Sequence, residues 1–127
     1  MRWAKRLPGL LAWGLWALSP PTQAQSAERG TALYEARCGA CHSVDANRVG
    51  PMHQGLLGRK AGSAPGYAYS DALARSGLRW TAPTLDAWLA DPERLVPGQR
   101  MGYRVELPQD RADLIAYLAT LKSPGAH

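Results

Sequence analysis

Two cysteines and a histidine stand together at residues 38–42, in the order Cys-Gly-Ala-Cys-His. The thiols of Cys38 and Cys41 can each add to one vinyl group of a haem, and His42 directly behind them is then held beneath the iron. A redox dithiol or half of a zinc site are the competing interpretations. A thioredoxin-like dithiol needs a βαβ context that we do not find, and zinc needs further ligands, for which only His53 and His127 remain. The motif predicts one covalently attached haem c, with Cys38 and Cys41 as its attachment points and His42 as an iron ligand.

The iron of such a haem needs a sixth ligand or keeps an open coordination site. The candidates are Met52, His53, Met101 and His127. Met52 and His53 follow His42 so closely that the chain would have to turn around the haem edge at once. Met101 lies much further along, in a Pro-Gly loop, where the chain has room to return on the opposite face. The position favours Met101 as a ligand, with a gap-filling core methionine as the alternative.

The first 24 residues have the pattern of an export signal. Three basic residues precede an uncharged run over residues 7–18, and small residues stand at Thr22 and Ala24 before a plausible cleavage point. An uncleaved membrane anchor is the alternative, although this short run is a poor match to roughly 30 Å of hydrocarbon. We expect a cleaved signal peptide at residues 1–24, one domain at residues 25–127, and a periplasmic location, where c-type haem is attached.

Three of the five units of formal net positive charge on the chain lie in that signal. It holds three of the fifteen Lys and Arg residues and none of the ten acidic ones, so cleavage lowers the formal net charge from +5 to +2. A nucleic-acid-binding protein would carry a dense basic stripe. We therefore expect no nucleic-acid partner, and no membrane span once the signal is removed. The remaining chain can bury a modest core, to which a large apolar cofactor would add.

Helical signals dominate the rest of the sequence, and we find no strand pattern. Ser26 and Ser70 are suited to cap helices, Gly77 and Pro92 to end them, and Gly30 in the middle of a helix indicates a close helix contact. The predicted helices cover residues 27–37, 70–75, 84–90 and 108–121. The fold class is therefore all-α.

Several further segments follow the haem motif in order. They are Val-Gly-Pro at 49–51, Gly-Leu-Leu-Gly-Arg-Lys-Ala-Gly at 55–62, Ala-Pro-Gly-Tyr-Ala-Tyr-Ser-Asp-Ala at 64–72, Trp80, Val-Pro-Gly-Gln-Arg-Met at 96–101 and Arg-Ala-Asp-Leu-Ile-Ala-Tyr-Leu at 111–118. This order resembles the class I cytochromes c, closest to the mitochondrial type and its bacterial relatives. The resemblance implies a cytochrome c fold, with three to five short helices and loops wrapped around one covalently bound haem.

The resemblance also implies a set of cofactor contacts. Met101 matches the sulfur ligand of the iron, and Pro51 matches the proline whose carbonyl accepts the Nδ1–H of the proximal histidine. Three positions match groups that reach the haem propionates: Arg59, Tyr69 and Trp80. Four positions match the crossing of the first and last helices: Gly30, Tyr34, Leu114 and Tyr117.

Three positions depart from the family pattern. Trp88 stands where many relatives have a tyrosine near the methionine sulfur, and its indole N–H can donate but not accept a hydrogen bond. Gln99 replaces a threonine beside a propionate. His53 takes a position commonly filled by leucine, and we expect it at the surface. Trp88 and Gln99 are retained as cofactor contacts.

Iron with both axial positions filled by His42 and Met101 has no site for a substrate. The resemblance therefore implies an electron carrier, not an enzyme, that exchanges one electron at a time. Its partners would be redox proteins such as a membrane quinol-oxidising complex, a terminal oxidase or a photosynthetic reaction centre. The alternatives are a five-coordinate haem sensor or peroxidase-like enzyme, and an electron-donating subunit of a dedicated enzyme.

Family members meet acidic partners through lysines around the exposed haem edge. Here the matching or nearby positions carry five arginines: Arg37, Arg48, Arg94, Arg100 and Arg104. We expect these arginines to form a basic rim that steers the approach of partners. The alternative is that they are solvated surface charges.

Overall fold

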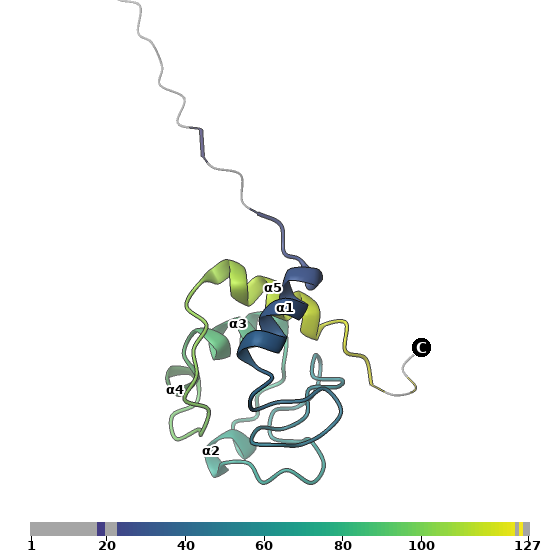
Figure 1. Cartoon of the computed structure of the whole chain (residues 1–127). Helices are drawn as coiled ribbons and strands as arrows, with labels where there is room; N and C mark the ends of the chain where they lie inside the picture. Colours follow the sequence, from purple (N-terminus) through teal and green to yellow (C-terminus); the bar gives the residue numbers. More distant parts are fainter. Residues whose placement is uncertain (1–17, 20–22, 124, 126–127) are drawn as a thin grey trace, which may run out of the picture.

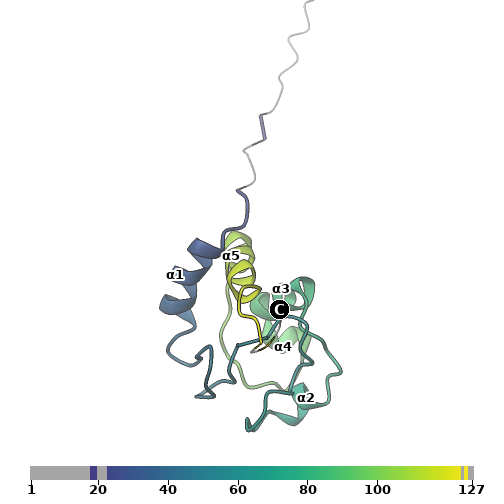
Figure 2. The ribbon, with the colours of Figure 1, turned by 90° about the vertical axis from the view of Figure 1, so that its right-hand side faces the viewer.

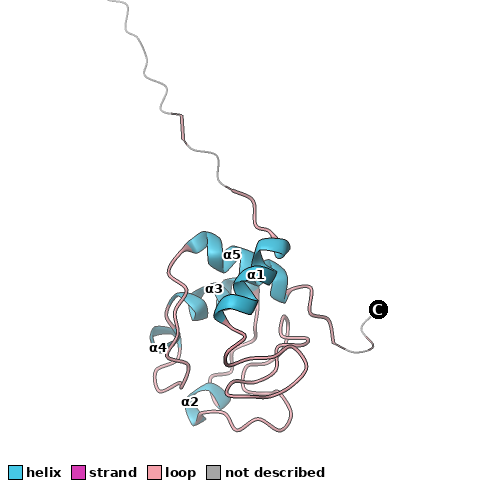
Figure 3. Ribbon diagram, viewed as in Figure 1, coloured by secondary structure: helices cyan, strands magenta, loops and turns pink. Residues whose placement is uncertain are grey.

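The computed structural model describes residues 18–19, 23–123 and 125, so most of the predicted signal and His127 lie outside the described residues. Five helices and long loops make up this part of the chain, and no strand occurs in it (Figures 1 and 3). The helices are α1 (Ala27–Arg37), α2 (Asp71–Ala74), α3 (Ala82–Ala90), α4 (Pro92–Leu95) and α5 (Pro108–Leu118). The predicted all-α class is confirmed. None of these helices has the length and hydrophobicity needed to cross a bilayer.

Two helices begin where the sequence predicts. The Ser26 hydroxyl accepts a hydrogen bond from the Arg29 N–H at 3.2 Å and starts α1. The Ser70 hydroxyl accepts one from the Leu73 N–H at 3.1 Å and starts α2. Such side-chain oxygens satisfy N–H groups that have no partner inside the helix. Soon after α2, Gly77 takes φ +69°, a backbone conformation that suits glycine and turns the chain away.

Three details of the other helices differ from the prediction, whereas the end of α1, the end of α3 and the start of α5 agree with it. Helix α3 begins at Ala82, two residues early, because Thr81 and Thr84 cap each other's backbone N–H groups. Helix α4 was not predicted, since Pro92 was interpreted only as the end of α3. Proline is equally suited to the first turn of a helix, and the Asp91 carboxylate caps α4 by accepting from the Arg94 N–H at 3.2 Å. Helix α5 ends at Leu118 and not at Leu121.

Helices α1 and α5 lie side by side in both views of the ribbon, and their backbones touch (Figures 1 and 2). The contact is at Gly30, where an added Cβ would lie only 2.0 Å from the Asp113 carbonyl oxygen. One turn further, the rings of Tyr34 and Tyr117 pack with their centroids 5.0 Å apart. The close helix contact expected at Gly30 is therefore present, and no larger residue fits there without moving a helix.

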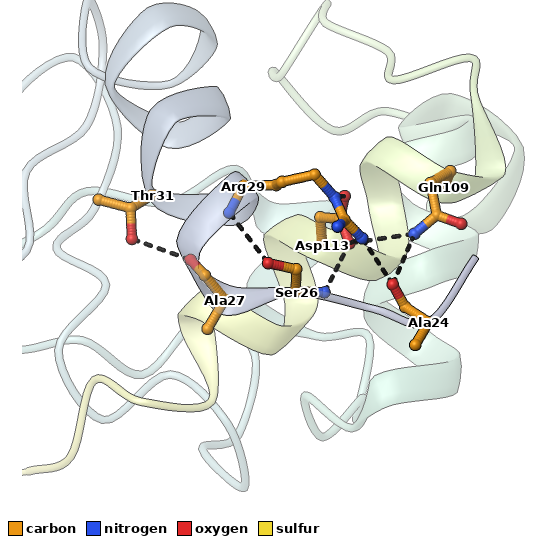
Figure 4. Close-up of polar contacts among 7 residues, drawn as sticks. All are labelled: Ala24, Ser26, Ala27, Arg29, Thr31, Gln109 and Asp113. Carbon is orange, nitrogen blue, oxygen red and sulfur yellow. Dashed lines mark hydrogen bonds and ion pairs between the residues drawn. The ribbon is translucent and has the colours of Figure 1, made fainter.

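A buried carboxylate fastens the same crossing from the side (Figure 4). Asp113 is 2% exposed and accepts hydrogen bonds from the Ser26 N–H at 2.7 Å, from Arg29 Nε at 2.8 Å and from Gln109 Nε2 at 3.1 Å. The Arg29 guanidinium holds the pKa of this carboxyl below its ordinary value. Arg29 and Gln109 also donate to the Ala24 carbonyl oxygen, at 2.5 and 3.4 Å. The network thus ties the segment before α1 to α5.

Between α1 and α2 the chain forms loops with little regular structure (Figure 3). One antiparallel bridge joins Lys60 and Arg79, and the Ala61 N–H donates to the Leu78 carbonyl at 2.8 Å. Buried apolar side chains from α1, α2, α3, α5 and the connecting loops make up one core cluster. Most of them line a hollow in the protein, so the helices and loops form its walls.

We expect Asp113→Asn to lower the free energy of unfolding by about 1–3 kcal/mol, because the buried donors lose a charged acceptor. Chemical denaturation of the purified protein at neutral pH would measure this loss. Asp71→Asn is the matched control, since Asp71 pairs with Arg75 at 3.8 Å on an exposed helix surface and should contribute less than about 0.5 kcal/mol. Equal losses of the free energy of unfolding in the two variants would contradict the stabilising role of the Asp113 carboxylate.

The same carboxylate should also give a pH dependence. Its pKa is lowered in the folded protein. Its stabilising contribution is therefore complete above the ordinary value of 3.8 and is lost as the pH falls through the lower pKa of the folded state. The difference in the free energy of unfolding between the parent protein and Asp113→Asn should shrink as the pH falls over that range.

Candidate functional site

A cavity of about 660 Å³ opens among the helices and loops, with mainly apolar walls. Nine of the ten residues predicted to contact the cofactor line it: Cys38, Cys41, His42, Pro51, Arg59, Tyr69, Trp80, Trp88 and Met101. They come from segments far apart in the sequence. The fold therefore brings the residues of the haem motif together with residues that the sequence related to it by position or by resemblance.

The two cysteines lie in a tight turn directly after α1. The Cys41 and His42 N–H groups both donate to the Cys38 carbonyl oxygen, at 3.1 and 2.9 Å. Arg48 donates to the Gly39 carbonyl oxygen at 2.7 Å and fixes the turn from outside. Both thiols are free, and burial raises the pKa of the Cys38 thiol. The turn thus presents both thiols to the cavity.

The His42 ring is restricted by its immediate neighbours. Its Nδ1 lies 2.9 Å from the Pro51 carbonyl oxygen, the contact predicted for a proximal histidine. The Gly50 backbone lies against the ring, where an added Cβ would be 2.1 Å from His42 Cε1. Burial lowers the pKa of His42, which favours the neutral ring. With Nδ1 engaged, Nε2 is the nitrogen left for a ligand in the cavity.

His53 is not the surface residue that we expected. Its ring stacks on that of His42, with centroids 4.1 Å apart and planes 23° apart. Its Nδ1 lies 2.9 Å from the Tyr34 hydroxyl. Burial, followed by the charges of His42 and Arg59, lowers the pKa of His53 to about 3. The surface expectation failed because the identity of a single residue carries no information about its tertiary neighbours.

Arg59 provides a charge that is incompletely satisfied by the protein. Its guanidinium donates to the Gln54 and Met52 carbonyl oxygens at 3.2 and 2.9 Å. Its Nε is buried and has no hydrogen-bond partner among the described residues. Burial lowers the pKa of Arg59, although a guanidinium still keeps its proton near neutral pH. An orphaned N–H on a buried cation calls for an anionic acceptor in the cavity.

Aromatic side chains form much of the remaining wall. Trp80 and Trp88 are both buried and pack edge to face, with ring centroids 5.3 Å apart. The Tyr69 hydroxyl accepts a hydrogen bond from the Ala64 N–H at 3.0 Å. These rings supply a large apolar surface together with polar edges, as an amphipathic flat cofactor requires.

Met101 lines the cavity on a short loop before α5. Its N–H donates to Gln99 Oε1 at 2.5 Å, and Gln99 Nε2 donates to Glu93 at 3.2 Å. Gln99 itself is not among the residues that line the cavity, and its side chain braces the Met101 backbone. Met52, an alternative ligand candidate, does not line the cavity either.

One contact at the cavity mouth was not foreseen. The Tyr103 ring, which is partly exposed, lines the cavity two residues after Met101. Arg37 donates to the Tyr103 hydroxyl at 2.8 Å and pairs with Asp110 at 3.0 Å. Only the sequence proximity of Tyr103 to Met101 could have pointed to it.

Together these residues fit a haem. The two free thiols match covalent attachment, while His42 Nε2 and the Met101 sulfur are suitable axial ligands. The apolar walls suit a porphyrin, and the orphaned Arg59 Nε suits a propionate, since buried carboxylates need a charged or hydrogen-bonding partner.

The chain is similar to known proteins along most of its length. A family model described as Cytochrome c matches residues 27–122. The cytochrome c of Euglena viridis is 42% identical over 99 residues, 76% of this chain and 97% of that protein. Cytochrome c2 of Rhodopila globiformis is 45% identical over 96 residues, 73% of this chain and 91% of that protein. The solved structure of cytochrome cH from Methylobacterium extorquens has a TM-score of 0.72 and 46% identity, covering 75% of this chain and 98% of that one.

We expect Gly50→Ala to lower the free energy of unfolding by about 1–3 kcal/mol, because the new methyl group would overlap the His42 ring. Gly102→Ala is the control: Gly102 also lines the cavity, but an added Cβ there would meet nothing within 4 Å. Denaturation curves of both variants would measure the difference. A Gly50→Ala protein as stable as the parent would show that the His42 ring is not confined.

Proposed function

Because the chain belongs to the cytochrome c family, we propose that it is an exported one-electron carrier whose iron is bound by His42 and Met101. Proteins of this family carry one covalently attached haem c and act as electron carriers, not as enzymes. The observation that carries the proposal is that His42 and Met101, from distant parts of the sequence, line one cavity together with two free thiols.

The cysteines would fix the cofactor in place. Each thiol adds across one vinyl C=C bond: a sulfur–carbon bond forms and the thiol hydrogen passes to the other carbon. The tight turn at residues 38–42 holds Cys38, Cys41 and His42 in one unit. Attachment through the thiols therefore also brings the His42 ring to the cofactor.

The charged and aromatic wall residues would orient the cofactor. Arg59 has a free N–H for a propionate, and Tyr69 and Trp80 lie in the same lining. Trp88 would pack against the porphyrin, and its indole N–H can donate but not accept a hydrogen bond.

When bound, the haem supplies reversible Fe(II)/Fe(III) exchange. His42 and Met101 would both bind the iron, which would leave no coordination position for a substrate, and the apolar walls would exclude water. Sulfur ligation and a dry pocket favour the reduced state and raise the reduction potential. Electron transfer would then occur at the cavity mouth and would require no catalytic acid, base or nucleophile.

The remaining parts of the proposal concern location and partners. We propose that residues 1–24 are a cleaved signal, that the domain from residue 25 works in the periplasm, and that its partners are membrane redox complexes. The predicted leader pattern and the likeness to bacterial cytochromes c2 support this.

Met101→Ala tests the ligand assignment directly. We expect the haem to stay covalently attached and the ferric sulfur-to-iron charge-transfer band to vanish. The reduction potential should fall by on the order of 0.1–0.3 V, within the range of about 0.8 V that axial ligands control. Absorption spectroscopy and redox titration measure both effects.

Met52→Ala is the control, since Met52 is the other methionine near the site but does not line the cavity. It should keep the band and the potential of the parent. An unchanged spectrum in Met101→Ala would remove Met101 as a ligand, and absence of the band from the parent itself would favour a five-coordinate haem.

The arginines of the expected rim are not equivalent. Arg37 pairs with Asp110 at 3.0 Å, and Arg104 with Asp91 at 3.1 Å, which offsets their charge. Arg48, Arg94 and Arg100 have no acidic side chain within 4.0 Å among the described residues. Arg100 is exposed and lines the cavity, so we propose that it contributes most to steering.

Arg100→Gln should slow oxidation by the anionic oxidant ferricyanide several-fold at low salt, because a positive charge is lost at the cavity mouth. Stopped-flow absorbance would measure the second-order rate. Arg75→Gln removes the same charge from an exposed residue at the C-terminal end of α2. It should change the rate less. The difference should disappear as salt brings the screening length below about 10 Å. Equal effects of the two substitutions would indicate that the rate depends on the total charge of the protein and not on a local basic rim.

A further inference from the structure

The ring of His53 is placed against that of His42 in a way that restricts its rotation. The two planes lie within 23° of each other and their centroids are 4.1 Å apart. A flat ring at van der Waals distance blocks rotation of its neighbour about the bond to the side-chain stem. The Pro51 carbonyl fixes where His42 Nδ1 points, whereas the stacked ring adds a constraint on the tilt of the imidazole plane.

His53 is itself held by a residue of α1. Its Nδ1 and the Tyr34 hydroxyl lie 2.9 Å apart, and the two rings meet edge to face with centroids 5.6 Å apart. Tyr34 is 5% exposed and packs against Tyr117 of α5. The orientation of the His53 ring is therefore set from the crossing of α1 and α5.

Packing alone does not account for a histidine at this position. An aliphatic side chain would fill the same space without polar atoms, and a buried imidazole nitrogen without a partner is unfavourable. Tyr34 supplies that partner, with its hydroxyl oxygen 2.9 Å from His53 Nδ1. The hydrogen bond between Tyr34 and His53 therefore gives the His53 ring a fixed direction against His42, which an aliphatic residue would lack.

We propose that His53, anchored by Tyr34, is a positioning residue that fixes the plane of the His42 imidazole. This inference rests on the proposed function, in which His42 is an axial ligand of the iron. Neither Tyr34 nor His53 would touch the iron in this scheme. They act through the orientation of His42, as outer residues commonly do for metal-bound histidines.

The test uses the haem-loaded protein and three single substitutions. Tyr34→Phe removes the anchoring hydroxyl and keeps every ring. His53→Gln keeps an acceptor for Tyr34 and removes the stacked ring. Tyr117→Phe is the matched control, because it removes the same group from a neighbouring tyrosine whose hydroxyl makes no hydrogen bond to His53.

The readout is the set of haem methyl resonances in the NMR spectrum of the ferric protein. Unpaired spin spreads over the porphyrin according to the planes of the axial ligands, so a rotated His42 changes the spread of these shifts. We expect Tyr34→Phe and His53→Gln to alter the pattern and Tyr117→Phe to preserve it. Unfolding midpoints, measured in parallel, separate orientation from simple loss of packing.

An unaltered methyl pattern in Tyr34→Phe and His53→Gln would overturn the inference, even if both proteins lost stability. If His53→Gln does not fold, Tyr34→Phe decides alone, since it deletes one oxygen atom. The ferric sulfur-to-iron band of the parent tests the proposed function separately. Its absence would refute His/Met ligation, whereas its presence with an unaltered methyl pattern would refute only the role of His53.

Discussion

The backbone contact between α1 and α5 is the constraint on which the rest of this structure depends. At Gly30 the two helices approach so closely that a single methyl group would meet the Asp113 carbonyl oxygen. The buried Asp113 side chain fastens the same crossing to Ser26 and Arg29. Because α1 leads directly into the cysteine turn and the Met101 loop leads into α5, this crossing brings the first and last thirds of the chain to one cavity.

The walls of that cavity combine low polarity with a few directed polar groups. Trp80 and Trp88 supply large apolar surfaces, while the Arg59 Nε is a charged donor with no hydrogen-bond partner among the described residues. Around the mouth, ion pairs neutralise Arg37 and Arg104, but Arg100 lines the opening without a described acidic neighbour. Charge at the surface is thus distributed unevenly despite the small net charge expected after removal of the leader.

The sequence predicted the parts of the fold that depend on local chemistry. Ser26 and Ser70 mark the starts of α1 and α2, and the haem motif identifies the attachment turn. It missed α4, because Pro92 can end one helix as readily as it begins the next. The surface position expected for His53 is wrong for a different reason. Its neighbours, His42 and Tyr34, are brought close only by the tertiary fold, which spacing does not specify.

The restriction of His42 and of the Met101 backbone has a further consequence for the rate of electron exchange. Gly50, Pro51 and His53 surround the imidazole, and Gln99 accepts the Met101 N–H. In the proposed carrier, a His42 ring held in this way would shift little when the charge at the iron changes by one unit. Little energy would then be needed to rearrange the nuclei around it, so the polypeptide itself would keep the reorganisation energy small before any partner is met.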